Sequence, residues 1–392
     1  MMLKQYFSNH AKRPKYISLV LVILAVAGIG TYLLIGSHAT TPYASITADN
    51  GVLTGSTTKK SCTGSSNGSC VVFGAAATTG KDEGKSRYKL DAASFFDPYG
   101  NSTWAPWVQA NITLMEGYPP YSDKYVNLFG LPLIGYHDPA YPPSSVTGLS
   151  ASQIQTYVGW VSTDMHNGYA GVFVDDSNWT FSPNPGPPAQ LAALMVALRS
   201  AYPNILIEMN SQYHDIWPIM QNPSNPDYPY VEQALSKINI VCKEFGVGPT
   251  AGIGSPSDYA SFMQYVDTLH SKGIHIDMTS DYHNYNAPTL EYNLATYFLV
   301  NDGGDFVGGA DPRSTSPWSP RFNVNLGNAT ASRQRSSSGV WTRTFTGGAV
   351  YTVEPGATTQ TITLPAPMKD INTGNTVSSV TLGPASGVVL MK

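Results

Sequence analysis

Two adjacent carboxylates stand where an apolar stretch of the sequence ends. The segment GVFVDDSNW carries Val172, Phe173 and Val174, followed at once by Asp175 and Asp176. In an α/β protein, ligands and catalytic groups gather outside the carboxyl ends of the parallel strands. The segment therefore predicts a buried strand whose exit places acids for chemistry.

A second acid follows another apolar stretch, in the segment IVCKEFG, which contains Glu244. Glycosidic cleavage requires a pair of carboxylates flanking the scissile bond, one acting as nucleophile or base and the other as proton donor. We therefore take Asp175 and Glu244 as the candidate catalytic pair.

Side-chain alternation suggests which way Asp175 points. Along a strand it shares a face with Phe173, whereas Asp176 points with Val172 and Val174. If the two valines pack under helices, Asp175 faces the axis of a barrel.

The surroundings of Glu244 suggest its role. Ile238, Ile240 and Cys242 precede it on one face of the predicted strand, and apolar surroundings raise the pKa of a carboxyl group. This pattern favours Glu244 as the general acid. Two alternatives stay open: either acid could cap a following helix, and Glu244 could pair with Lys243.

Polar and aromatic residues follow the other predicted strands and are candidates for substrate binding. The full set is His137, Asp138, Asp176, Trp179, Asn210, Tyr213, Asp281 and Tyr282. His137 and Asp138 could equally form a turn, and any one of the aromatic residues could belong to the core. Glu208, His275 and Asp277 lie inside predicted strands and are left out, because satisfied core polar groups are equally common there. The Asp-rich strand exits leave a metal site possible, but the spacing supports no particular metal, and no cofactor is expected.

Alternating strands and helices position these residues. The sequence predicts strands over 88–92, 112–115, 131–136, 171–174, 205–209, 238–245, 274–278 and 305–307. A helix is expected to begin with a capping box of Ser150 and Gln153 and to end at Gly168; further helices are predicted over 188–201, 231–236, 257–272 and 290–299. The later strands start about 30 to 36 residues apart, which favours a (β/α)8 barrel over residues 86–322. An open doubly wound sheet is the second choice, since no Gly-rich dinucleotide loop follows the first strand.

The pattern changes near residue 323. Short alternating β-rich runs separated by Gly, Pro and Asn continue to residue 392 and are typical of an antiparallel β-sandwich.

The first residues indicate a membrane. Lys4, Lys12, Arg13 and Lys15 precede an uncharged run over 16–36, long enough to span a bilayer with residues 1–15 in the cytoplasm. A cleaved signal peptide is the alternative, although its apolar region is usually shorter. The rest of the chain would then be extracellular.

Residues 37–85 form a predicted Ser/Thr/Gly-rich linker, in which Cys62 and Cys70 could pair and a short hairpin is expected. The net charge of −4 argues against a nucleic-acid partner. Nothing in the sequence indicates an oligomeric state.

Five segments together resemble a family of predicted glycoside hydrolases, hypothetical glycosyl hydrolase family 15, over about residues 86–392. They are LPLIGYHDPAY, GVFVDDSNW, IVCKEFG, VWTRTFTGGAVYTVEP and VTLGPASGVVL. The resemblance implies a (β/α)8 barrel with a C-terminal β-sandwich that hydrolyses O-glycosyl bonds. Barrels of the similar α-galactosidase clan carry a nucleophilic Asp on the fourth strand and an acid/base carboxylate on the sixth. Asp175 and Glu244 match those places if the strand count holds, while Asp176 and Lys243 depart from the pattern.

These observations predict a membrane-anchored, outward-facing glycoside hydrolase that acts on an extracellular or cell-wall polysaccharide, with retention of configuration. A catalytically inactive barrel that binds glycan at the cell surface is the main alternative. A purely structural surface protein, with every aromatic residue in the core, is the third.

Overall fold

The protein consists of two compact units, residues Met1–Thr79 and Gly80–Lys392. The computed structural model describes residues 57–61, 69–73, 82–90, 112–126, 130–138, 149–175, 188–211, 213–281, 284, 286–308 and 323–392. The predicted membrane anchor over 16–36 lies outside these ranges. Among the helices within them, none combines the length and the apolar character needed to cross a bilayer.

The described part of the first unit is an antiparallel pair of strands, β1 (Thr57–Ser61) and β2 (Ser69–Phe73). This pair lies in the predicted linker and agrees with the short hairpin expected there. Cys62 lies outside the described residues, so its pairing with Cys70 stays a prediction.

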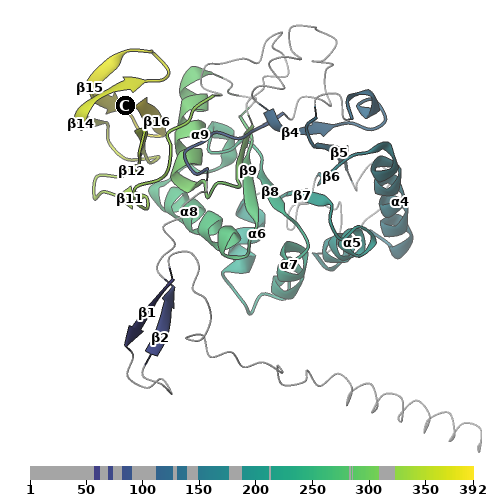
Figure 1. Ribbon diagram of the computed structural model, residues 1–392. Coiled ribbons are helices and arrows are strands. Elements are labelled where there is room, and N and C mark those ends of the chain that lie inside the picture. Colours follow the sequence, from purple (N-terminus) through teal and green to yellow (C-terminus); the bar gives the residue numbers. More distant parts are fainter. Residues whose placement is uncertain are drawn as a thin grey trace, which may run out of the picture. The chain divides into compact units, whose positions relative to one another are not determined.

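The second unit is built on a closed barrel of eight parallel strands in the order β10-β3-β4-β5-β6-β7-β8-β9 (Figure 1). The predicted barrel is therefore confirmed. In chain order the strands are β3 (Tyr88–Leu90), β4 (Ile112–Gly117), β5 (Leu133–His137), β6 (Gly171–Val174), β7 (Leu206–Asn210), β8 (Ile240–Lys243), β9 (His275–Met278) and β10 (Phe306–Gly308). Asp175 directly follows the fourth barrel strand and Glu244 directly follows the sixth, as the strand count from sequence required.

Helices alternate with these strands close to the predicted positions. They are α4 (Ala151–Asn167), α5 (Pro188–Ala201), α6 (Tyr213–Met220), α7 (Tyr228–Leu235), α8 (Pro256–Ser271) and α9 (Ala287–Val300), with short 3-10 turns η3 (Asp123–Tyr125) and η4 (Pro249–Ala251).

Local sequence explains the bounds of α4. Ser150 and Gln153 form the predicted capping box, in which each side chain accepts a hydrogen bond from the other residue's backbone N–H. Gly168 ends the helix in the left-handed region, at φ 94°. Ile154, Tyr157 and Val161, spaced three and four residues apart, form the buried face of the helix.

Alternation along the barrel strands separates two apolar layers. Val172 and Val174 belong to the large core that the helices share, whereas Phe173 belongs to a separate cluster inside the barrel. The other buried members of that inner cluster are Leu114, Ile134, Ile240, Cys242 and Phe306. This division confirms that the face carrying Phe173 and Asp175 turns toward the barrel axis.

The C-terminal part is an antiparallel sheet of six strands in the order β11-β12-β13-β16-β14-β15, which confirms the predicted all-β domain. The strands are β11 (Gln334–Arg335), β12 (Val340–Phe345), β13 (Gly348–Val353), β14 (Gln360–Asp370), β15 (Thr376–Leu382) and β16 (Ser386–Met391).

The two faces of this sheet bury different apolar layers. Val350 and Val389 join the core that includes α9, which lies beside the sheet in Figure 1. On the other face, Val388 packs in one cluster with Leu364 and Met368 of the long strand β14. The close approach to α9 depends on Gly387, since a Cβ there would lie 2.8 Å from the Cβ of Ala295.

Candidate active site

Asp175 is held at the carboxyl end of β6 by side chains from the two neighbouring strands. Tyr136, on β5, donates a hydrogen bond from its hydroxyl group to Asp175 Oδ2. Asn210, the last residue of β7, donates from Nδ2 to Asp175 Oδ1 over 2.7 Å. Both carboxylate oxygens are therefore oriented, and the half-buried side chain is fixed at the mouth of the barrel.

Tyr136 belongs to a stack of aromatic rings that lines this mouth. Its ring stacks on Tyr118 at 5.3 Å and on Phe173 at 5.7 Å, measured between ring centroids. Burial, followed by the charge of Asp175, raises the pKa of Tyr136 well above its ordinary value. The phenol therefore stays protonated and remains the donor to Asp175.

Asn210 also offers an unused acceptor. The side chain is 8% exposed, and its Oδ1 is buried without a hydrogen-bond partner. Since Nδ2 is committed to Asp175, the amide orientation is set and Oδ1 is left to accept a donor.

Beneath this group, the barrel interior holds a buried cluster of charges. The ammonium group of Lys89 lies 2.7 Å from Glu116 Oε2, 2.7 Å from Glu208 Oε1 and 3.2 Å from Asp277 Oδ2. It also lies 4.4 Å from the centroid of the Phe173 ring. Lys89, on β3, thus pairs with carboxylates on three other strands, β4, β7 and β9, beneath the candidate site.

The cluster carries more carboxylates than cations, and this affects Glu208. Burial raises the pKa of Glu208, Lys89 opposes that rise, and Asp277 and Glu116 add to it. Cys242 is also near, since one atom from each of Glu208, Cys242 and Asp277 lies within 4.8 Å of the others.

Glu244 occupies the matching position at the exit of β8 and is half-buried. Strand alternation places it on the face of Ile240 and Cys242, which line the barrel interior. Lys243 is fully buried, and its Nζ donates to the backbone carbonyls of Glu244, at 2.8 Å, and Ala251, at 3.4 Å.

Lys243 thereby fixes the turn that follows the strand. This turn contains two residues with positive φ, Phe245 at 64° and Gly246 at 51°. Burial of the ammonium group lowers the pKa of Lys243 to about 8. Lys243 and Glu244 therefore do interact: the ammonium group donates to the backbone carbonyl of Glu244, and the charge of Glu244 opposes the lowering of the Lys243 pKa by burial.

The structure describes some of the other predicted binding residues and not others. Asp138 follows β5, and its charge acts on the nearby Tyr136 and Tyr157. Three others, Asp176, Trp179 and Tyr282, lie outside the described residues, and their binding role stays a prediction.

Three predicted residues make contacts away from Asp175. His137 points outward, where its Nε2 lies 2.6 Å from Asp164 Oδ2 of α4. Tyr213 is buried in the helical core, with its ring 5.4 Å from that of Tyr265. Asp281 holds loops together, because its carboxylate accepts from the backbone N–H of Thr250 and of Asn284.

Sequence reasoning missed Tyr136 and Lys89. Tyr136 precedes His137 in a strand whose inner face already carried Ile134, so alternation alone could have selected the tyrosine. For Lys89 the signal was a charged residue inside an otherwise apolar strand.

No protein-family model and no curated protein matches the chain. Solved structures with a similar course of the chain include an α-amylase from Geobacillus thermoleovorans in complex with acarbose. It has a TM-score of 0.43 and 10% identity, and covers 79% of this chain and 98% of its own.

A family 39 glycoside hydrolase from Bacteroides cellulosilyticus has a TM-score of 0.46 and 11% identity, covering 82% of this chain and 84% of its own. A GH30 endoxylanase from Clostridium papyrosolvens has a TM-score of 0.44 and 12% identity. The match covers 79% of this chain and 97% of the endoxylanase. Similarities at these values do not establish an activity, and the resemblance to hypothetical glycosyl hydrolase family 15 stays a prediction.

Proposed function

We propose that the barrel hydrolyses O-glycosyl bonds at its carboxyl-end mouth, with Asp175 as nucleophile and Glu244 as acid/base. The observation that carries this proposal is the placement of Asp175. Its carboxylate lies on the inner face at the end of the fourth strand, and groups from the third and fifth strands orient both of its oxygens. Glu244 stands two strands away, at the end of the sixth.

In the first step Asp175 attacks the anomeric carbon of the bound sugar as Glu244 protonates the glycosidic oxygen. The bond to the leaving group breaks, and a covalent glycosyl ester forms on Asp175. Tyr136 and Asn210 align the attacking oxygen, which reduces the entropy cost of reaching the reactive geometry.

In the second step Glu244, now ionised, takes a proton from water, and the water oxygen displaces Asp175 from the anomeric carbon. Two displacements on opposite faces restore the original configuration, so the reaction retains the anomeric form. Asp175 leaves as a carboxylate and Glu244 ends protonated, which returns both groups to their starting states.

The substrate class in this proposal is a polysaccharide outside the cell. The ring of Tyr118, which stacks on Tyr136 on one side, suits the apolar face of a sugar. The uncharged run over 16–36 with its basic flank supports a membrane anchor that leaves the barrel outside.

The test is a hydrolysis screen with the full chain against a panel of plant, fungal and bacterial polysaccharides and 4-nitrophenyl glycosides. We expect new reducing ends on at least one member, and NMR of the first products should show the anomeric form of the substrate. Binding to a polysaccharide without turnover of any member would instead support the inactive glycan-binding barrel. An inverted product would show that Asp175 is not the nucleophile.

A further inference from the structure

A row of aromatic rings runs from the barrel interior past Asp175 to the surface. The ring of Phe173 stacks on that of Tyr136, which stacks on that of Tyr118. The ring of Tyr121 follows, 6.3 Å from that of Tyr118 between centroids and tilted by 34°. Tyr121 is 76% exposed, the highest value for a large apolar side chain within the described ranges. The row therefore begins in the apolar layer beneath the mouth and ends in solvent.

The loop that carries Tyr118 and Tyr121 is held firmly on the barrel. It directly follows β4, and the backbone N–H of Ser122 donates to the carbonyl oxygen of Tyr118 over 3.1 Å. Ser122 is fully buried, with its Oγ 2.7 Å from the hydroxyl oxygen of Tyr169. The same hydroxyl group donates to Asp123 Oδ1 over 2.8 Å. The backbone that presents Tyr121 is thus ordered before a ligand arrives, which lowers the entropy cost of binding.

The position of Tyr121 matters more than its exposure. A single exposed apolar residue is common on a protein surface, but Tyr121 continues the row that passes Asp175, on a loop at the carboxyl ends of the strands. Ligands of α/β barrels bind at this end. An aromatic ring with a free face suits the apolar face of a sugar, and the phenol hydroxyl group suits its polar edge.

Charges at the mouth indicate which class of glycan fits. Asp138 and Asp175 follow adjacent strands, and the charges of both act on Tyr136. The ammonium group of Lys243, at the end of β8, is fully buried. A chain of anionic sugars would approach the two carboxylates against Coulomb repulsion. The mouth therefore favours an uncharged glycan.

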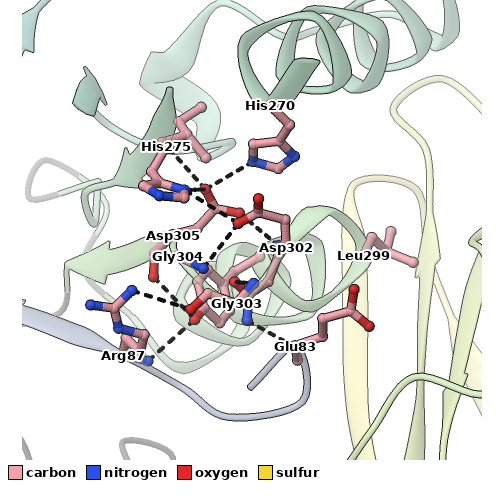
Figure 2. Close-up of polar contacts among 12 residues, drawn as sticks. Glu83, Arg87, His270, His275, Leu299, Asp302, Gly303, Gly304 and Asp305 are labelled. Carbon is pink, nitrogen blue, oxygen red and sulfur yellow. Dashed lines mark hydrogen bonds and ion pairs between the residues drawn. The ribbon is translucent and has the colours of Figure 1, made fainter. Parts of the chain in front are cut away.

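Polar groups at the opposite end of the barrel interact with one another instead. His270 Nε2 lies 2.9 Å from Asp305 Oδ1, and His275 Nδ1 lies 3.3 Å from Asp302 Oδ1. Figure 2 shows these four residues, the His270–Asp305 cluster, around the turn that leads into β10. The cluster connects α8 and β9 to this turn, so its polar groups serve the packing of the barrel.

We propose that Tyr121, with Tyr118, forms a stacking platform for an uncharged glycan chain whose scissile bond lies at Asp175. A sugar unit on Tyr118 lies next to the reaction, and a unit on Tyr121 lies further out along the same chain. This inference rests on the proposed function and narrows its substrate to a glycan of several units. A glycoside of one unit would leave Tyr121 unoccupied, so affinity should increase with chain length.

Affinity electrophoresis tests the platform without turnover. Native gels contain mixed-linkage β-glucan, xylan, mannan or soluble starch, and one further gel contains alginate, an anionic chain. The full chain is run in the cold, in a detergent without a sugar head group. We expect at least one uncharged chain to retard the wild type, and alginate to retard it less.

Variants of Tyr121 separate the ring from the rest of the surface. Tyr121→Ala should weaken the affinity from gel retardation by about 3- to 10-fold, the range for one aromatic stacking contact. Tyr121→Phe keeps the ring and should bind within about twofold of the wild type. Tyr230→Ala, at the 39% exposed tyrosine of α7, is the matched control and should bind as the wild type does.

Hydrolysis gives a second readout. The loss of kcat/KM in Tyr121→Ala should be larger on the polysaccharide than on the 4-nitrophenyl glycoside of the same sugar. Equal affinity in Tyr121→Ala and Tyr230→Ala would overturn the platform, as would retardation by alginate alone or by none of the gels. Turnover that does not depend on Tyr121 would overturn the platform and leave the proposed hydrolysis intact. Binding through Tyr121 without any turnover would do the reverse.

Discussion

Asp175 depends on a donor that contributes nothing else to the proposed reaction. The hydroxyl group of Tyr136 orients Asp175 Oδ2, while the ring of Tyr136 fills the stack between Tyr118 and Phe173. The two contributions can be separated, because phenylalanine keeps the ring and removes the donor.

We expect Tyr136→Phe to lower kcat on the substrate found by the screen by about 10- to 100-fold. This is the loss in rate expected when a hydrogen bond to a charged group is removed. KM should change little, and the circular dichroism spectrum should match that of the wild type. Tyr118→Phe, in the same stack, is the control. An equal effect of both changes would show that the stack matters and the donor does not.

Lys243 gives the molecule a defined dependence on pH. Its pKa is lowered to about 8 in the folded protein by burial, against about 10.4 for an unfolded lysine. Between these values the unfolded chain binds more protons than the folded one, so stability rises with pH across this window.

The free energy of unfolding of the wild type, relative to Lys243→Met, should therefore increase by about 1.5 kcal/mol between about pH 8 and 9.5. Urea titrations at several pH values measure it. The same substitution at Lys272, a partly exposed lysine paired with Glu232, is the control for removing a lysine charge. Parallel curves for wild type and Lys243→Met across this window would contradict the account.

At the scale of elements, the capping box of α4 is a testable local signal. Ser150→Ala removes the acceptor for the N–H of Gln153 and should lower the free energy of unfolding by about 1 kcal/mol. Activity should persist, because the helix lies outside the barrel. Ser162→Ala, in the middle of the same helix, should leave stability unchanged or raise it. A smaller loss in Ser150→Ala than in Ser162→Ala would refute the capping role.

Elements of this kind were largely predictable from the sequence. Periodicity and caps located every helix from α4 to α9 except α6, and alternation placed Asp175 on the inner face, because these signals act over a few neighbouring residues. The strand count also held, since each barrel strand is a short apolar run with a polar exit.

Side-chain partners were harder to predict. His137 was expected at the mouth, yet the outer face of β5 turns it toward Asp164 of α4. Tyr213 opens α6, a helix absent from the sequence prediction, and is buried by α8. Such contacts join residues far apart in the chain, and no local pattern reports them.

At the scale of the whole molecule, the barrel interior depends on one cation. Lys89 on β3 reaches carboxylates on β4, β7 and β9, and so links strands on different sides of the barrel. Removing one partner from a buried ionic group leaves uncompensated charge in a medium of low polarity.

Lys89→Met should therefore lower the free energy of unfolding by about 3–5 kcal/mol. Chemical denaturation measures the loss, and Lys85→Met, at an exposed position nearby, is the control with little expected change. Stability equal to that of the control would mean that protonation of the carboxylates, including Glu208, compensates for the missing lysine.

The whole fold thus separates two kinds of chemistry along the barrel. The carboxyl ends of the strands present Asp175 and Glu244, while the amino ends hold the His270–Asp305 cluster. Turnover is expected to depend on the first end and not on the second.

The most direct test of this account compares turnover by Asp175→Asn and Glu244→Gln with that of the wild type on the glycan found by the screen. Asp267→Asn and Glu232→Gln make the same chemical changes on the outside of the barrel unit and serve as controls. We predict that both site variants keep the wild-type fold and lose at least about 1,000-fold in kcat, as expected when a group that acts in the transition state is removed. Turnover by Asp175→Asn equal to that of Asp267→Asn would contradict the assignment of Asp175 as the nucleophile.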